Sequence, residues 1–171
     1  MMPLPPDPTA ASTRTSTSVS SRWVSPDMRN VSGLGQGLEK IEDFIDRITG
    51  TYEEIEEVWL MGSRANGTAR PDSDWDLLVF ADEPTFRRMR KNHRLRRAEI
   101  DCLVVRGGNE FREPWGRRPK HGDLCGWGWT KMSKSEAEYD ATKWVEDEDG
   151  GRTISKRCRA IRIWPRQARV R

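Results

Sequence analysis

The chain has 171 residues, of which 35% are hydrophobic and 33% are charged, and its formal net charge is +3. This length and composition predict one soluble domain with a modest core and disfavour a second independent core. A membrane-spanning helix is also excluded, because it would need a run of about 18 apolar residues. Cys102, Cys125 and Cys158 are far apart in the sequence. We therefore expect neither a disulfide framework nor a zinc site, and a reducing, cytoplasmic location.

The N-terminal part of the chain differs in composition from the rest. Residues 1–33 are rich in Pro, Ser and Thr, with few large apolar residues and no periodicity, which predicts a disordered tail. Residues 34–171 are then expected to form a single domain, with a core over 34–106 and a C-terminal β extension over 122–165. The closely spaced glycines at the start of this domain are interpreted as a hinge, because no strand precedes them.

Two helices are predicted around the central segment. Apolar residues recur at helical spacing between residues 38 and 49, and Gly50 is the expected stop. A second helix is predicted from Glu83 to about residue 97, with Pro84 in its first turn. Residues 107–122 are rich in Gly, Pro and Arg and are interpreted as a loop.

The C-terminal part shows the patterning of β structure. Residues 124–129 alternate in side-chain type around two glycines. Residues 142–146 and 153–164 predict two strands joined by an acidic, glycine-containing turn, which is a hairpin signal. We expect this hairpin to extend the same sheet or to form a packed flap.

A short apolar run at residues 58–61 predicts a buried strand that ends at Gly62 and Ser63. Glycine lets a backbone approach a phosphate closely, and Ser63 offers a hydroxyl and a free N–H where a short helix begins. The sequence therefore predicts an anion-binding turn after this strand.

A second apolar run at residues 77–80 follows directly after Asp74 and Asp76. In a strand these two carboxylates lie on one face, roughly 6.6 Å apart along the chain. Carboxylate oxygens suit hard divalent cations, and two such ions stand about 3.5–4 Å apart in phosphoryl-transfer sites. The sequence thus predicts a metal-binding segment that one short connector joins to the anion-binding turn.

The order Gly62-Ser63-Arg64, a gap of about ten residues, and Asp74-Trp75-Asp76 resembles the polymerase-β-type nucleotidyltransferase superfamily, and most closely its minimal nucleotidyltransferase branch. The resemblance implies an α+β fold with a mixed sheet flanked by helices. It also implies a third carboxylate on a later strand, for which Glu99 and Asp101 are the candidates. Asp101 is preferred, because it lies deeper in an apolar run, where an unpaired carboxylate is costly to bury.

The resemblance implies that three carboxylates bind two Mg²⁺ ions and form the catalytic set: Asp74, Asp76 and Asp101. The ions would hold the triphosphate of an NTP, with ATP as the expected nucleotide. The Gly62 backbone and Ser63 are the expected phosphate-binding groups, and Arg64 is expected either to assist them or to form a surface ion pair. A copy of the fold that binds partners without transferring nucleotides is the alternative.

The expected reaction moves an NMP from the NTP onto a hydroxyl acceptor. Small members of the superfamily are similar to antitoxins that transfer AMP to a partner toxin, and the short core favours such a protein acceptor. An RNA or tRNA end is the alternative, because seven of the eleven residues between Arg87 and Arg97 are basic. A second basic run, from Lys156 to Arg171, has seven basic residues in sixteen. A solvated face and a basic tail would explain both runs without a partner.

Overall fold

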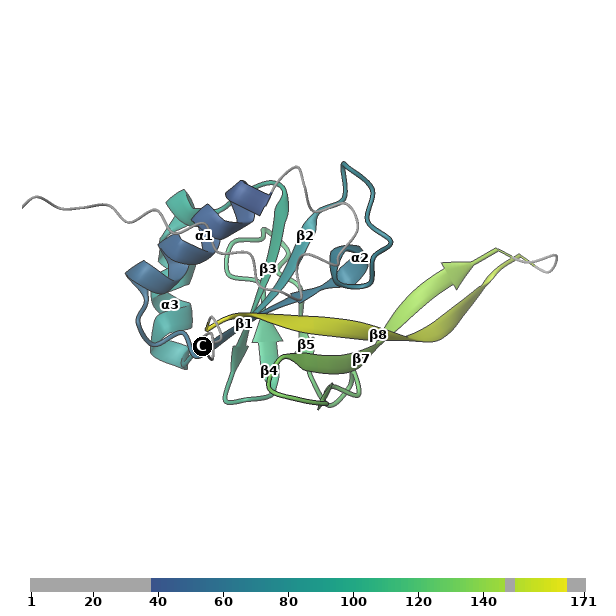
Figure 1. The fold of residues 1–171 in the computed structure, drawn as a ribbon. Helices are drawn as coiled ribbons and strands as arrows, with labels where there is room; N and C mark the ends of the chain where they lie inside the picture. The colour runs from purple at the N-terminus through teal and green to yellow at the C-terminus, as the bar shows by residue number, and fades with distance from the viewer. Residues whose placement is uncertain (1–37, 147–149, 166–171) are drawn as a thin grey trace, which may run out of the picture.

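The computed structural model describes residues 38–146 and 150–165, so the predicted tail and glycine hinge lie outside the described residues. Helices and strands alternate in the first part of the chain, and strands follow one another in the second (Figure 1). The elements are α1 (Leu38–Thr51), β1 (Glu57–Met61), α2 (Gly62–Ala65), β2 (Trp75–Phe80), α3 (Glu83–Lys91), the 3-10 helix η2 (His93–Leu95), β3 (Ile100–Arg106), β4 (Glu110–Arg112), β5 (His121–Asp123), β6 (Thr130–Lys131), β7 (Glu136–Val145) and β8 (Arg152–Trp164).

The strands form one mixed sheet in the order β5-β4-β3-β2-β1-β8-β7-β6. β2 and β3 run parallel, and the other neighbouring strands run antiparallel. The predicted alternation of helix and strand up to β3 is confirmed. Because β1 lies between β2 and β8, the last of the described strands completes the middle of the sheet and not its edge.

The two faces of the sheet are covered by different parts of the chain. α1 and α3 lie on one face (Figure 1), where Phe44 and Phe86 pack in one buried cluster with Leu77. Side chains alternate along a strand, so Leu78 belongs to the opposite face. There it packs in a second cluster with Tyr139 of β7 and the two tryptophans that follow β5.

The two predicted helices are present, but their ends differ from the prediction. α1 continues beyond the expected stop at Gly50, because the N–H of Tyr52 still donates to the carbonyl of Ile48 at 2.9 Å. α3 is shorter than predicted and ends before Asn92, whose backbone (φ −96°, ψ 74°) is no longer helical. Apolar spacing therefore located α1, and Pro84 the start of α3, without fixing where the backbone leaves either helix.

Two segments between β3 and β7 differ in type from the prediction. The expected loop at 107–122 contains β4 and the first two residues of β5, and both strands extend the sheet beyond β3. Residues 124–129, which alternate as a strand would, form a turn in which the N–H of Trp129 donates to the Leu124 carbonyl at 3.0 Å. Gly128 has a positive φ of 58°, which lets the chain reverse there.

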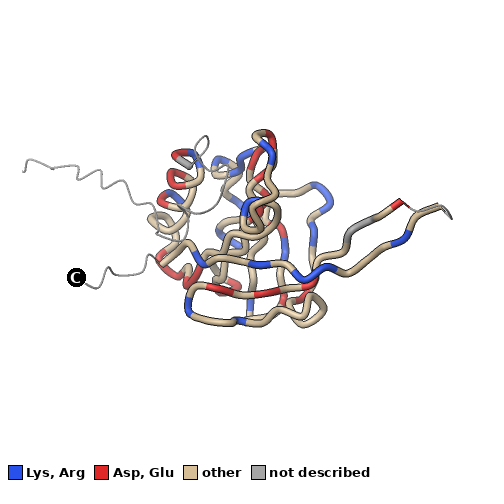
Figure 2. Tube along the Cα trace, turned by 45° about the vertical axis from the view of Figure 1, so that its right-hand side comes forward, with Lys and Arg blue, Asp and Glu red and all other residues tan. Residues whose placement is uncertain are grey.

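The predicted C-terminal hairpin is present, with β7 longer than expected, and its far end stands clear of the rest of the molecule (Figure 1). Acidic side chains on β7 face basic side chains on β8, and Figure 2 shows the two charge types side by side. The pairs are Arg159 with Glu136 (2.6 Å), Arg157 with Glu138 (3.1 Å) and Arg157 with Asp140 (3.3 Å). Acidic side chains of β7 thus neutralise part of the second basic run, the part that lies on β8. Residues 166–171 of that run lie outside the described residues.

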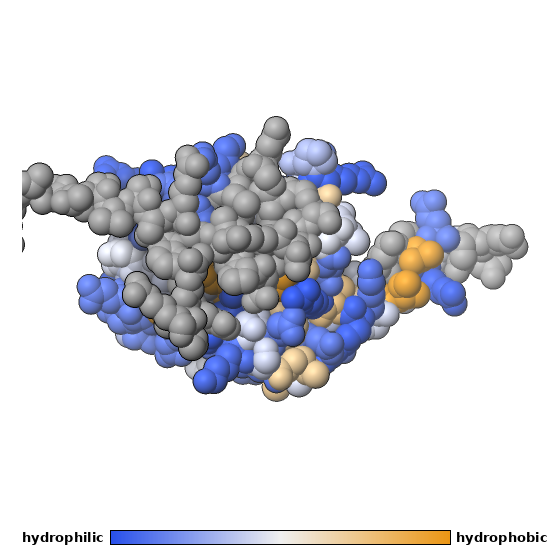
Figure 3. All heavy atoms as spheres, in the orientation of Figure 1, coloured by the Kyte–Doolittle hydropathy of each residue, from blue (hydrophilic) through white to orange (hydrophobic). Residues whose placement is uncertain are grey.

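The visible surface is largely hydrophilic, with hydrophobic atoms out on the projecting hairpin (Figure 3). Among the described residues, the large hydrophobic side chains that are exposed are Met132 (60%) and Ile154 (36%). No described helix is long and apolar enough to cross a lipid bilayer.

We predict that Ile161→Ala lowers the free energy of unfolding by about 2–5 kcal/mol, because Ile161 is 1% exposed and joins β8 to the helix-covered core. The matched control on the same strand is Ile154→Ala, whose exposed side chain predicts a change within about 0.5 kcal/mol. Urea unfolding followed by circular dichroism measures both. Equal losses in the two variants would contradict the docking of β8 against β1.

Candidate active site

Two of the three predicted carboxylates are brought together by the parallel pairing of β2 and β3. Asp76 lies directly opposite Asp101 in the register of these strands. Neighbouring strands are about 4.8 Å apart, so the two half-buried side chains emerge side by side on the face opposite α1 and α3. Asp74 lies just before β2 and is exposed. Glu99, the rejected candidate, lies before β3, with its carboxylate 3.9 Å from the ammonium of Lys40.

The environment of Asp76 disfavours its negative charge. Burial raises the pKa of this carboxyl above its ordinary value of 3.8, and the negative charges of Asp101 and Asp74 raise it further, while Lys120 and Arg64 oppose the shift. A carboxylate that is half removed from water beside another carboxylate is stabilised by a cation. The pair is therefore a place where positive charge binds favourably.

The backbone of Gly62 touches one of these carboxylates. Met61, the last residue of β1, lies opposite Asp76, and Gly62 follows with a positive φ of 67°. A Cβ atom at this position would overlap the carboxylate oxygen Oδ2 of Asp76. The N–H of Gly62 donates to the hydroxyl of Tyr139 at 3.0 Å. Only glycine allows the predicted anion-binding turn to lie this close to the carboxylates.

Ser63 and Arg64, the other predicted phosphate-binding residues, differ in their surroundings. Ser63 is half-buried, and its hydroxyl has no hydrogen bond to any described residue. Arg64 is 4% exposed, so the expected surface ion pair is wrong. Its Nε donates to the carbonyls of Ser73 (3.1 Å) and Asp74 (3.2 Å), and its guanidinium carbon lies 4.2 Å from the ring centroid of Trp75. This contact positions the segment that carries Asp74, and a phosphate contact of Arg64 stays a prediction.

Sequence reasoning missed Lys120, whose ammonium forms an ion pair with the carboxylate oxygen Oδ2 of Asp101. Asp101 raises the pKa of Lys120 by this hydrogen bond, with smaller contributions from the charges of Asp76 and Glu113. The only sequence signal was the basic composition of residues 107–122, which places no single lysine at the site.

Two further missed residues join the C-terminal hairpin to the turn after β1. Tyr139 accepts the hydrogen bond of Gly62, and burial raises the pKa of its phenol. The amide of Asn66 donates to the carbonyls of Gly62 (2.7 Å) and Arg159 (3.2 Å), and accepts from the N–H of Arg159 at 2.9 Å. The hairpin is therefore part of the site's framework, although no local pattern in the sequence indicates it.

A family model, the nucleotidyltransferase domain, matches residues 38–150. The chain belongs to this family. It is an enzyme of the nucleotidyltransferase class, with a mixed sheet and few helices. A crystal structure of a provisionally assigned nucleotidyltransferase from Sulfolobus solfataricus is similar at 23% identity and a TM-score of 0.39, over 52% of this chain and 81% of that one. No curated protein matches the chain.

Nucleotidyltransferases of this family generally use an NTP and a divalent metal. Within residues 38–146 and 150–165, no three His, Cys, Asp or Glu side chains are placed to hold a metal ion together. Asp74 lies exposed in the segment directly before β2, close enough for its charge to act on Asp76, and its membership of a three-carboxylate set stays a prediction. The pair of Asp76 and Asp101 does fit a hard cation, since its donors are oxygens and its two charges repel each other.

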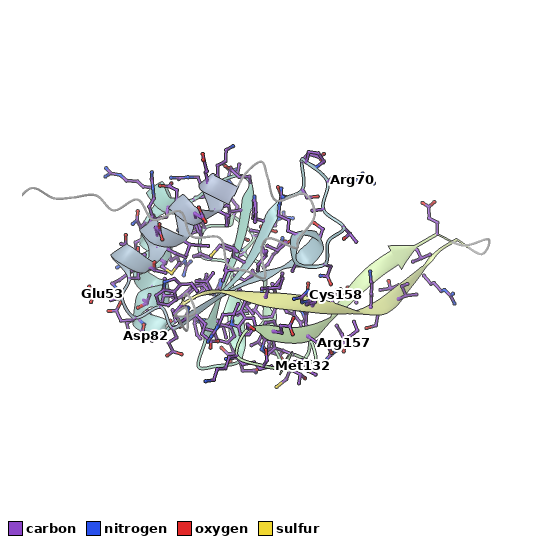
Figure 4. All side chains as sticks on the ribbon, in the orientation of Figure 1. Glu53, Arg70, Asp82, Met132, Arg157 and Cys158 are labelled. Carbon is purple, nitrogen blue, oxygen red and sulfur yellow. The ribbon has the colours of Figure 1, made fainter. Side chains whose placement is uncertain are left out.

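The basic helix α3 begins at the far end of β2 from the carboxylates. Figure 4 shows Asp82, the cap residue before α3, at one end of the molecule and Arg70, in the loop that leads into β2, near the other. α3 also packs on the face opposite the carboxylates through Phe86 and Met89. Its basic side chains therefore belong to a surface separate from the candidate site.

We predict that Gly62→Ala destabilises the nucleotidyltransferase more than Gly67→Ala does. Both glycines have a positive φ, 67° and 69°, so both variants bear a backbone cost of about 1–2 kcal/mol. Only the new methyl group at residue 62 also overlaps Asp76, whereas residue 67 has open space around it. Unfolding free energies in urea measure the difference.

The Asp76→Ala background supplies the control for this comparison. Removing the carboxylate should relieve most of the extra cost of Gly62→Ala, because its oxygen is the nearest obstacle. Equal costs for the two glycine variants in the wild-type background would contradict the close approach.

We predict that Asp76→Asn makes the metal-free enzyme more stable near neutral pH. The pKa of Asp76 is raised in the folded state, so the stability that its proton contributes is fully present below pH 3.8 and is lost as the pH rises through the raised value. The free energy of unfolding of Asp76→Asn should therefore rise relative to that of the wild type as the pH increases, and the difference should disappear in acid. Urea unfolding across this pH range in EDTA tests the sign, and Asp74→Asn is the exposed control.

Proposed function

We propose that this enzyme is a Mg²⁺-dependent, polymerase-β-like nucleotidyltransferase. In this proposal it moves an NMP, with ATP as the expected donor, onto a hydroxyl of a protein partner in the cytoplasm, as an antitoxin does to its toxin. The observation that carries the proposal is the contact of the Gly62 turn with a carboxylate that lies in register with Asp101. An anion-binding backbone and a cation-binding pair are then adjacent, as the transfer of a nucleotide from a metal-bound triphosphate requires.

Each residue of the site has a role in this proposal. Asp76 and Asp101 would hold Mg²⁺, which supplies charge neutralisation on the phosphates and a lowered pKa for the attacking hydroxyl. Asp74 would complete the ligand set from the exposed segment before β2. The Ser63 hydroxyl would bind a phosphate oxygen, because it has no competing partner among the described residues. The Gly62 N–H would do the same after exchanging the Tyr139 hydroxyl, to which it donates at 3.0 Å, for the phosphate. Arg64 would hold the Asp74 segment in place.

The choice of a protein acceptor is supported by the layout of the two faces. The carboxylate pair lies on the face that is bordered by β7 and by the turn at residues 124–129, and the hairpin of β7 and β8 projects from the molecule with further exposed surface (Figure 1). The basic helix lies on the opposite face, and two of its arginines are already paired, Arg87 with Glu83 at 2.9 Å and Arg88 with Glu54 at 2.6 Å.

An RNA acceptor is the second candidate, and one observation favours it. Four exposed basic residues in and after α3 form no ion pair with any described residue: Arg90, Lys91, Arg94 and Arg96. The deciding experiment incubates the enzyme with each labelled NTP and Mg²⁺ in the presence of either cell protein or total RNA. Label in protein supports the proposal, and label in RNA alone replaces it with the second candidate. Metal-dependent NTP binding without any labelled product would indicate a binding module.

We predict that Asp76→Asn and Asp101→Asn each lower the rate of transfer by about 10²–10³-fold, because each removes a group that stabilises the transition state through the metal. Glu99→Gln is the matched control, since it removes a neighbouring negative charge that lies outside β3. Labelled-nucleotide transfer at saturating Mg²⁺ measures all three. Loss of transfer in Glu99→Gln with full activity in Asp101→Asn would reverse the assignment of the third carboxylate.

A further inference from the structure

The loop between β4 and β5 brings a positive charge onto the carboxylate pair. β4 and β5 pair with Arg112 opposite His121, so residues 113–120 form the hairpin loop. The last residue of this loop is Lys120, and its ammonium contacts Asp101 directly. Asp101 in turn lies beside Asp76 in the parallel register. The ammonium of Lys120 therefore supplies a positive charge to this carboxylate pair from the chain itself.

The backbone of Lys120 is held in a defined place. The N–H of Glu113 donates to the carbonyl of Lys120 at 2.8 Å, and the N–H of Lys120 donates to the Glu113 carboxylate at 3.3 Å. The loop is also tied to the helical layer, because the indole N–H of Trp115 donates to the Met89 carbonyl at 2.7 Å. These bonds fix the base of the lysine side chain next to β3 and leave only its flexible stem to move.

The ammonium of Lys120 can still separate from the carboxylate of Asp101. The side chain of Lys120 is 61% exposed and that of Asp101 is 37% exposed, so water can replace the contact. An ion pair with this exposure is weak enough to break on binding. An ammonium at a carboxylate oxygen weakens the binding of a divalent cation to the same carboxylate, because the two positive charges repel each other at that distance.

We propose that Lys120 is a built-in competitor of the catalytic cation: it occupies Asp101 until metal and nucleotide arrive together. This inference rests on the proposed metal-dependent function. A metal ion alone must displace the ammonium into water, with its positive charge still close by. A metal ion that arrives with an NTP also brings phosphate oxygens to which the displaced ammonium can bind. Lys120 therefore suppresses metal binding in the absence of nucleotide and so couples the two ligands.

The test measures the binding of Mn²⁺, as a probe for Mg²⁺, by calorimetry in the absence of nucleotide. We expect Lys120→Gln to bind Mn²⁺ about 1.5- to 5-fold more tightly than the wild type, the range for loss of one partly exposed competing contact. Lys120→Arg keeps the charge and should stay near the wild type. Arg117→Gln is the matched control, because it removes an exposed positive charge from the same loop, without the contact to Asp101.

A second measurement repeats the titration with a non-hydrolysable NTP analogue present. The difference between wild type and Lys120→Gln should shrink, because the phosphates then take up the ammonium of the wild type. Equal Mn²⁺ affinity of Lys120→Gln and wild type without nucleotide would overturn the role of Lys120. An equal gain in Arg117→Gln would overturn it too, since the effect would then be general electrostatics.

These outcomes are distinguishable from failure of the proposed function. Asp76→Asn should abolish Mn²⁺ binding if the carboxylate pair is the metal site. Mn²⁺ binding that depends on Asp76 but not on residue 120 leaves the metal-dependent transferase intact and removes only the inference. Absence of Mn²⁺ binding in every variant, with and without the analogue, overturns both.

Discussion

The contact between the backbone of Gly62 and the carboxylate of Asp76 is the constraint on which the rest of the site depends. It requires β1 and β2 to pair so that Met61 stands opposite Asp76, and it requires a residue without a Cβ atom directly after β1. The parallel pairing of β2 with β3 then adds the second carboxylate, Asp101. The positions of turn and carboxylates are thus set by the pairing of three strands and not by the flexibility of a loop.

Buried and paired charges hold the surrounding segments in place. The guanidinium of Arg64 is removed from water, yet it is satisfied by two carbonyls and the face of Trp75, so it ties the end of the connector at Ser73 and Asp74 to the turn after β1. Along the hairpin, acidic side chains of β7 pair with basic side chains of β8. In this part of the sequence, the clustered charges are explained by cross-strand ion pairs that stabilise the pairing of β7 with β8. This explanation is simpler than an anionic partner.

Local patterns in the sequence predicted the parts of the site that lie close together in the chain. The glycine turn, Asp76 and the strand that carries Asp101 follow from short apolar runs and their flanking residues. Lys120 was missed because its partner is 19 residues away, and Tyr139 because it contacts a residue 77 positions earlier. Such contacts depend on the order of strands in the sheet, which side-chain periodicity does not contain. The same limit explains residues 124–129, whose alternation fits a strand until Gly128 reverses the chain.

The central place of β8 has a consequence for how the protein is made. Glu57 at the start of β1 and Arg162 of β8 are 105 residues apart, yet their strands are neighbours. During synthesis β1 and β2 can pair early, but one edge of β1 stays open until β8 has left the ribosome. An open apolar strand edge invites pairing with other chains. The nascent protein is therefore most exposed to aggregation just before β8 emerges, and the turn that Asn66 fastens to β8 is completed only after that strand has docked.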